Sequence, residues 1–272
     1  MRKENIMKEL ELTGLKFEQA GTDGHVGIIT INRPFALNAM NTETIDEFKV
    51  LLDEIDKDKN IRCLILTGEG RAFCSGGDIS EEQTKNVVTG YEFSVNCGKL
   101  MNRMEHFRTP IIAAINGYAL GGGLEFALAC DIRIASKKAK IGSPEITLAV
   151  IPGWGGTQRL PRLIPASKAK QLMFTGDSVT AEEAYRIGLV DEISEPEQLM
   201  EDAIKMADKI SHWGPLAMER LKTAVAQGME VDLERGLEIE AALFGHLYGT
   251  EDQQEAMHAF LEKRPAKPTV GR

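Results

Sequence analysis

Two glutamates in the middle of the chain have surroundings that suit proton transfer. Glu125 follows a run of three glycines and precedes the apolar residues 126–130, at the start of an expected helix. Glu145 follows a proline and precedes residues 146–150, which carry no charge. Desolvation in that apolar run would raise the pKa of Glu145 toward neutrality, as acid–base chemistry requires. Two simpler explanations stay open: Glu125 would complement the helix dipole, and Glu145 would be an ordinary loop carboxylate.

Two glycine-rich segments could supply backbone N–H groups to the same chemistry. Gly121, Gly122 and Gly123 open the expected helix, whose first N–H groups have no partner within it and carry partial positive charge. Gly76 and Gly77 form a second cluster, where glycine allows a ligand to approach the backbone closely. A plain turn would also explain this second cluster. Carboxyls and N–H groups together are the parts of a site that stabilises an oxyanion.

Other kinds of site find little support in the sequence. Ser75 is not within a G-x-S-x-G motif, and Cys74 is expected to be a small buried thiol. The five histidines form no HExxH motif or metal-binding pair, so no metal site is predicted. Residues 153–156 (GWGG) do not form a dinucleotide-binding motif, and there is no Walker A sequence. NAD and ATP are therefore not expected as cofactors.

Composition indicates an ordinary globular protein. The chain has 272 residues, of which 43% are hydrophobic and 27% charged, and its net charge is −9. That charge argues against a nucleic-acid-binding surface. The four cysteines have no CxxC spacing, as is typical of reduced thiols in the cytosol. Residues 1–12 contain no signal-peptide run, and no window reaches the ~18 apolar residues of a membrane span. We therefore expect a cytoplasmic protein that does not bind membranes.

The pattern of apolar residues predicts an α/β fold that ends in helices. Strands are expected at 26–32, 61–67, 111–116, 131–135 and 140–142, and helices after 41–42, over 81–107 and over 121–130. Residues 72–78 are predicted to be a loop too rich in glycine for regular structure. This order suggests parallel strands in repeated ββα units. Helices are expected from there on at 167–174, 180–187, 197–210, 215–226, 233–247 and 251–261.

Four segments resemble the crotonase (enoyl-CoA hydratase/isomerase) superfamily, and the resemblance extends from about residue 26 to 261. They are residues 72–79 (AFCSGGDI), 116–125 (NGYALGGGLE), 144–146 (PEI) and 151–160 (IPGWGGTQRL). The resemblance implies a spiral of ββα units with a C-terminal helical region that forms trimers, and hexamers built from two trimers. It thus divides the chain into a core with the active site at 1–205 and a helical region at 206–272.

The resemblance also implies the roles of the candidate residues. The backbone N–H groups of Gly77 and Gly122 would form an oxyanion hole for the thioester oxygen of an acyl-CoA. Hydratases of the family use two glutamates, which correspond here to Glu125 and Glu145, whereas isomerases often use one. Hydration of a trans-2-enoyl-CoA is therefore expected, with a Δ3,Δ2-enoyl-CoA isomerase or another acyl-CoA enzyme as the alternative. No cofactor is expected, because the coenzyme A thioester is the substrate.

Further residues are expected from the resemblance to contact the substrate or its CoA part. They are Ala36, Ser75, Gly76, Asp78, Ile79, Gly153, Trp154, Phe260 and Lys263. The sequence departs from the family at Phe35 and Ser80, where lysines are common, which removes charge that could face the CoA phosphates. Trp154 replaces a residue that is usually small, and this bears on the length of the acyl chain.

Overall fold

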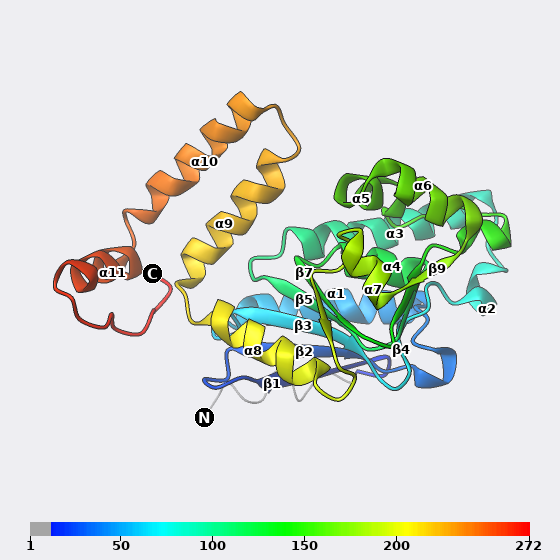
Figure 1. Cartoon of the computed structure of the whole chain (residues 1–272), viewed down its shortest axis with the longest axis horizontal. Coiled ribbons are helices and arrows are strands. Elements are labelled where there is room, and N and C mark those ends of the chain that lie inside the picture. The colour runs from blue at the N-terminus through cyan, green and yellow to red at the C-terminus, as the bar shows by residue number, and fades with distance from the viewer. Residues whose placement is uncertain (1–11) are drawn as a thin grey trace.

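Two β-sheets form the centre of the molecule (Figure 1), and the computed structural model describes residues 12–272. The prediction that residues 1–12 contain no signal peptide concerns residues that, except for residue 12, lie outside the described part of the chain. In spatial order, the described six-stranded sheet holds β1 (Leu15–Ala20), β2 (Val26–Ile31), β3 (Cys63–Gly68), β5 (Ile111–Ile115), β7 (Ile132–Ser136) and β10 (Glu192–Ser194). The described four-stranded sheet holds β4 (Ala72–Cys74), β6 (Tyr118–Leu120), β8 (Lys140–Gly142) and β9 (Ser178–Thr180).

The chain winds between the two sheets as a spiral. Strand pairs β3–β4, β5–β6 and β7–β8 each place their first strand in the larger sheet and their second in the smaller one. Strands β3, β5 and β7 pair in parallel in the larger sheet and β4, β6 and β8 in the smaller one, and helices separate one pair from the next. The pairs β1–β2 and β8–β9 are antiparallel. The predicted spiral of ββα units is therefore confirmed. The described helices are α1 (Thr42–Lys57), α2 (Ile79–Glu82), α3 (Val87–Glu105), α4 (Gly122–Leu128), α5 (Gly156–Leu163), α6 (Ala166–Thr175), α7 (Ala181–Arg186), α8 (Leu199–Ser211), α9 (Pro215–Gly228), α10 (Leu233–Leu247) and α11 (Glu251–Leu261), with the 3-10 turns η1 (Pro34–Ala36) and η2 (Glu145–Leu148).

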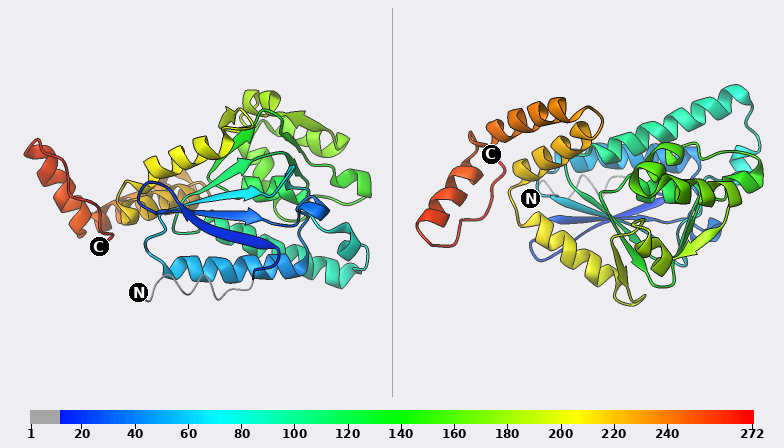
Figure 2. Two further views of the ribbon diagram at one scale, coloured as in Figure 1. Left: turned by 90° about the horizontal axis from the view of Figure 1, so that it is seen from below. Right: turned by 45° about the horizontal axis from the view of Figure 1, so that its top comes forward.

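The larger sheet is covered by helices on both faces (Figure 2). Successive side chains of a strand point to opposite faces, and β3 shows this clearly. Leu64 and Leu66 belong to the apolar cluster shared with α1 and α3, whereas Cys63 and Ile65 belong to the cluster shared with α8. Because both faces are buried, the strand reads as a continuous apolar run in the sequence.

Several elements differ from the sequence-based expectation. Residues 72–74 form the buried strand β4, so the prediction that 72–78 is entirely loop was wrong. The helix expected over 81–107 is interrupted, because the Asn86 side chain accepts hydrogen bonds from the N–H groups of Val88 and Thr89 and so starts α3. The sequence analysis did not predict β1, β6, β9, β10 or α5. Strand β1 has six residues and α5 has eight, whereas each of the other three has three residues. The shorter ones carry too few residues for a recognisable period.

The last three helices extend away from the sheets (Figure 1). Helices α9 and α10 pack side by side, and α11 lies at the far end of this arm. The predicted boundary at 205/206 falls inside α8, where Ala203 and Ala207 are fully buried against the sheet. None of the helices within residues 12–272 has the length and apolar character needed to cross a bilayer.

Candidate active site

One pocket of about 680 Å³ gathers most of the predicted site residues. Its lining includes Ala36, Ser75, Gly76, Gly77, Asp78, Ile79, Gly122, Glu125, Glu145, Gly153 and Trp154. Phe260 and Lys263 are not part of this lining. Phe260 is 83% exposed on α11, and Lys263 follows that helix on the arm remote from the pocket (Figure 1). Within one chain, the structure therefore does not bring these two residues to the site.

Glu125 is buried in the first turn of α4 and is held by two backbone donors. Its side chain is 3% exposed, and Oε1 accepts hydrogen bonds from the N–H groups of Trp154 (2.7 Å) and Gly156 (2.6 Å). Burial raises the pKa of Glu125 to about 7, and the negative charge of Glu145 adds to this effect, while the two hydrogen bonds oppose it. Glu125 is therefore poised to gain or lose a proton near neutral pH and is not a solvent-facing dipole partner.

Glu145 lies at the start of η2 and keeps one carboxyl oxygen free. Its Oε2 accepts a hydrogen bond from Ser143 Oγ at 2.7 Å. Its Oε1 is buried and has no hydrogen-bond partner among the described residues. A Cβ atom built on Gly121 would lie 3.4 Å from this oxygen, so the carboxyl lies beside the start of α4. The free oxygen is available to bind a ligand or to carry a proton.

The apolar run after Glu145 does not bury it as the sequence suggested. Ile146, Leu148 and Val150 are all about half exposed, at 46%, 57% and 50%. The strong burial falls on Glu125, whose shielding comes from Trp154 and the start of α5. The prediction that this apolar run desolvates Glu145 was thus wrong, and the strongly buried carboxyl is that of Glu125.

Two backbone N–H groups of the pocket are free to bind a ligand. Among the described residues, the N–H groups of Gly77 and Gly122 donate no hydrogen bond. Gly76 has φ of 109°, and a Cβ atom built on it would lie 3.3 Å from the nitrogen of Gly122, so the two loops touch. Gly122 is the first residue of α4, where N–H groups have no partner within the helix. This geometry fits the predicted pair of oxyanion-hole donors.

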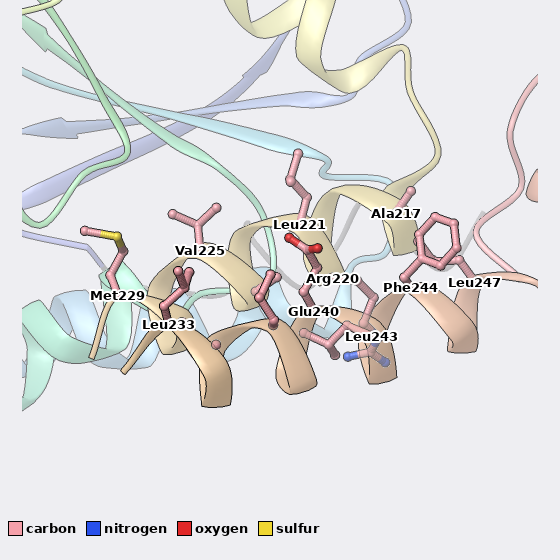
Figure 3. A pocket seen from close by; sticks show the side chains of 14 residues that line it. Ala217, Arg220, Leu221, Val225, Met229, Leu233, Glu240, Leu243, Phe244 and Leu247 are labelled. Carbon is pink, nitrogen blue, oxygen red and sulfur yellow. The ribbon is translucent and has the colours of Figure 1, made fainter. Parts of the chain in front are cut away.

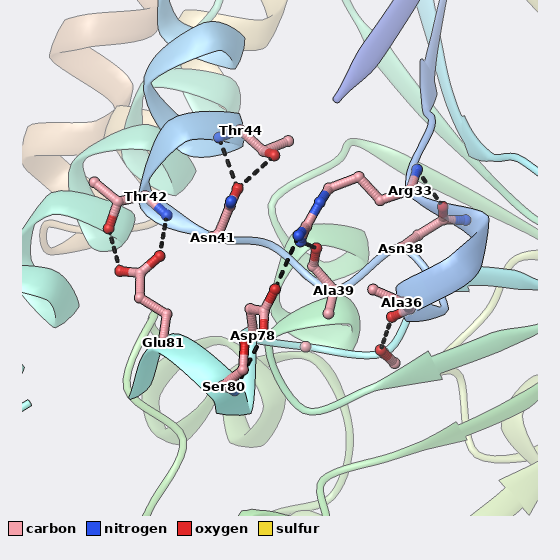
Figure 4. Close-up of polar contacts among 12 residues, drawn as sticks. Arg33, Ala36, Asn38, Ala39, Asn41, Thr42, Thr44, Asp78, Ser80 and Glu81 are labelled. Carbon is pink, nitrogen blue, oxygen red and sulfur yellow. Dashed lines mark hydrogen bonds and ion pairs between the residues drawn. The ribbon is translucent and has the colours of Figure 1, made fainter. Parts of the chain in front are cut away.

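The loop that carries Gly77 is fixed from the side of α1 (Figure 4). Arg33 donates to Asp78 at 2.9 Å, and this ion pair is largely buried. Asp78 also accepts from the N–H group of Ser80, and hydrogen bonds from Ser80 and Arg33 hold its pKa below the ordinary value. Glu81 binds the N–H and hydroxyl groups of Thr42. The Asp78 carboxylate thus orders the loop, and Arg33 is a positioning residue that the sequence analysis missed.

Trp154 forms a buried wall of the pocket. It is 5% exposed and packs edge to face on Phe93 and Phe126, with ring centroids 5.8 and 6.1 Å away. A Cβ atom built on Gly122 would lie only 2.2 Å from the Trp154 ring. Glycine at 122 is therefore required by the tryptophan ring, which leaves no room for a side chain.

The spiral of ββα units and the pocket of paired carboxyls and free N–H groups define a crotonase-type protein. The sequence model of the enoyl-CoA hydratase/isomerase family matches residues 21–269. The chain is 45% identical to a short-chain-enoyl-CoA hydratase of Clostridium acetobutylicum, over 94% of this chain and 97% of that protein. It is 44% identical to a crotonyl-CoA hydratase of Syntrophomonas wolfei, over 89% and 93%.

Solved structures agree with the sequence relatives. A crystal structure of an enoyl-CoA hydratase from Bacillus anthracis matches with a TM-score of 0.91 and 40% identity, covering 96% of this chain and 100% of that one. The chain belongs to the enoyl-CoA hydratase/isomerase family. The resemblance found in the sequence is confirmed.

The raised pKa of Glu125 predicts a pH-dependent stability. Its pKa of about 7 lies above the ordinary value of 4.5, so the folded protein holds a proton that the unfolded chain releases. The stability from this proton is fully present below about pH 4.5 and is lost as pH rises through about 7. A glutamine at this position does not titrate, so the Glu125→Gln protein does not lose this stability as pH rises. Urea unfolding should show its stability relative to wild type rising by on the order of 3 kcal/mol across this window. A difference that is constant with pH would contradict the assignment.

Proposed function

We propose that the protein is an enoyl-CoA hydratase, which adds water reversibly to a trans-2-enoyl-CoA to give a 3-hydroxyacyl-CoA. One observation carries the proposal. Glu125 and Glu145 line the same pocket as the unused N–H groups of Gly77 and Gly122. Water addition next to a thioester needs a base, an acid and a place for the charge that develops on the thioester oxygen. These four groups can supply all three.

The proposed reaction begins with the thioester oxygen bound by the two N–H groups. Glu125 removes a proton from a water molecule held between the carboxyls, and the water oxygen bonds to C3 of the enoyl group. The electrons of the double bond move toward the thioester oxygen, which becomes enolate-like. Glu145 then gives a proton to C2, which restores the thioester carbonyl. No metal or redox cofactor is needed in this scheme.

The two carboxyls have different surroundings, which suits different roles. Glu125 Oε1 is fully engaged by two N–H donors, so its second oxygen is the one that can accept a proton from water. Glu145 Oε1 has no partner among residues 12–272 and can hold the proton that C2 receives. The proposed scheme starts with Glu125 ionised and Glu145 carrying the proton that C2 receives.

We propose a short acyl chain as the substrate. The relatives named above are a short-chain-enoyl-CoA hydratase and a crotonyl-CoA hydratase. Trp154, packed between Phe93 and Phe126, fills space that an acyl chain could otherwise occupy. A role in fatty-acid β-oxidation and a cytoplasmic location fit this reading, and the four buried free thiols suit a reducing compartment.

Crotonyl-CoA and a 3-enoyl-CoA would distinguish a hydratase from an isomerase. The purified protein is expected to remove the absorbance of the conjugated crotonyl thioester as water adds. Conversion of the 3-enoyl-CoA to its conjugated isomer should be much slower. Rapid isomerisation without crotonyl-CoA hydration would favour single-acid chemistry, and no turnover on a panel of acyl-CoA esters would indicate a binding protein.

Replacing Glu145 tests the acid in the mechanism. Glu145→Gln keeps the size of the side chain but cannot donate the proton to C2. Turnover of crotonyl-CoA should fall by about 10²- to 10⁴-fold, with CoA-ester binding largely intact. Glu125→Gln is expected to lose a similar amount. Unchanged hydration in the Glu145→Gln protein would remove this residue from the mechanism.

We further propose a homo-oligomer, built as a hexamer from two trimers. The groove between α9 and α10 is lined by large apolar side chains (Figure 3), of which Leu221, Val225, Met229, Leu233, Leu237 and Phe244 are more than half exposed in the single chain. Exposed apolar patches of this kind mark interfaces between proteins. An identical chain is the partner that the family resemblance implies.

Light scattering of the purified protein tests the assembly. The expected mass is six times that of the 29.9 kDa chain. Leu221→Glu combined with Leu237→Glu places charge in the groove and should yield smaller species. Val50→Glu, on the exposed side of α1, is the control and should leave the mass unchanged. A monomer in the wild-type protein would refute the proposal.

A further inference from the structure

Besides Glu125, Glu145 and the paired Asp78, the carboxyl of Glu82 lies in the same pocket. Glu82 ends α2 and lines the pocket together with Glu125 and Glu145. A Cβ atom built on Gly77 would lie 1.8 Å from Glu82 Oε1 and 3.3 Å from the Trp154 ring. The carboxyl therefore touches the backbone of Gly77, next to the N–H group assigned to the thioester oxygen.

The other acids of this short helix are engaged elsewhere. Asp78 binds Arg33, and Glu81 binds Thr42, so both are held on the side of α1 (Figure 4). Lys85 donates to Glu81 at 2.7 Å and lies 4.3 Å from the centre of the Phe93 ring. The positive group closest in sequence to Glu82 is thus already paired with its neighbour.

The side chain of Glu82 has no hydrogen bond or ion pair with any of residues 12–272. Its half-buried position raises the pKa of the carboxyl, chiefly through desolvation, and the charges of Glu81, Asp78 and Glu145 act in the same direction against Lys85. Partial burial of a carboxyl without a partner is unfavourable, and an apolar side chain would serve an alkyl substrate better. The described residues therefore offer the Glu82 carboxyl no hydrogen-bond donor, and a substrate could supply one.

We propose that Glu82 determines substrate specificity by accepting a hydrogen bond from a hydroxyl group on the acyl chain, at C4 or beyond. The inference rests on the proposed hydratase function and narrows its substrate to hydroxylated enoyl-CoA thioesters. A carboxylate at the same place on the acyl chain is excluded by repulsion from Glu82 and Glu145. Glu82 does not take part in the proton transfers.

Relative kcat/KM for 4-hydroxybut-2-enoyl-CoA and crotonyl-CoA tests the assignment. The wild-type protein should prefer the hydroxylated substrate. Glu82→Met should lower that preference by about 10- to 100-fold, because a hydrogen bond to a carboxylate is lost, while crotonyl-CoA hydration persists. Glu92→Gln removes a nearby exposed carboxylate outside the pocket and should leave the ratio unchanged. No preference in the wild type, or an unchanged ratio in Glu82→Met, would overturn the proposal.

A second variant keeps the test decisive if Glu82→Met folds poorly. Glu82→Gln removes the charge at constant size and should improve hydration of a but-2-enoyl-CoA with a terminal carboxylate by at least about tenfold relative to crotonyl-CoA. No improvement would count against Glu82. Failure of the wild-type protein to hydrate crotonyl-CoA would instead refute the hydratase function, so the two failures are distinguishable.

Discussion

The site depends on the pair of hydrogen bonds that Trp154 and Gly156 donate to Glu125. They join the first turn of α4 to the segment that starts α5, and they bring a carboxyl to 3% exposure. Without these donors, burial at that depth would cost several kcal/mol. With them, the carboxyl is ordered and its pKa still rises to about 7. The same contact brings the Trp154 ring against Gly122, which is why a side chain at 122 has no room.

The smaller sheet explains how residues far apart in sequence meet. Strands β4, β6 and β8 run parallel, so their carboxyl ends lie along one edge. Gly76 and Gly77 follow β4, Gly122 follows β6, and Glu145 follows β8. Each turn of the spiral thus contributes to the pocket, and the turn after β6 supplies both Gly122 and Glu125. This is the general preference of parallel sheets for sites at the carboxyl ends of strands.

The sequence predicted what is encoded locally and missed what depends on packing. Helices α10 and α11 were predicted with their observed bounds, because amphipathic periods and the cap at Thr250 lie within the segments themselves. The glycine motifs were also local. The identity of the buried glutamate is not encoded locally. Glu125 is shielded by Trp154 and Gly156, which lie 29 and 31 positions further along the chain. Similarly, Glu81 and Glu82 are adjacent and alike in sequence, and only the position of α1 decides that the first faces Thr42 and the second the pocket.

Charge in the pocket links the chemistry to specificity. In the proposed mechanism two N–H groups stabilise the negative charge that develops on the thioester oxygen. The carboxyls of Glu82, Glu125 and Glu145 line the same space, as does Asp78, which is paired with Arg33. Ionisation of Glu82, Glu125 and Glu145 together would oppose the enolate-like state. Burial is the main cause of the raised pKa of Glu125 and of Glu82, and the charge of Glu145 acts in the same direction on both. For Glu125 the conflict is useful, because a proton that leaves near pH 7 is one that can be transferred. Glu82 transfers no proton, so its charge must be offset by a donor. In the proposed specificity, a hydroxyl on the acyl chain would supply this donor and reduce the repulsion as the oxyanion forms.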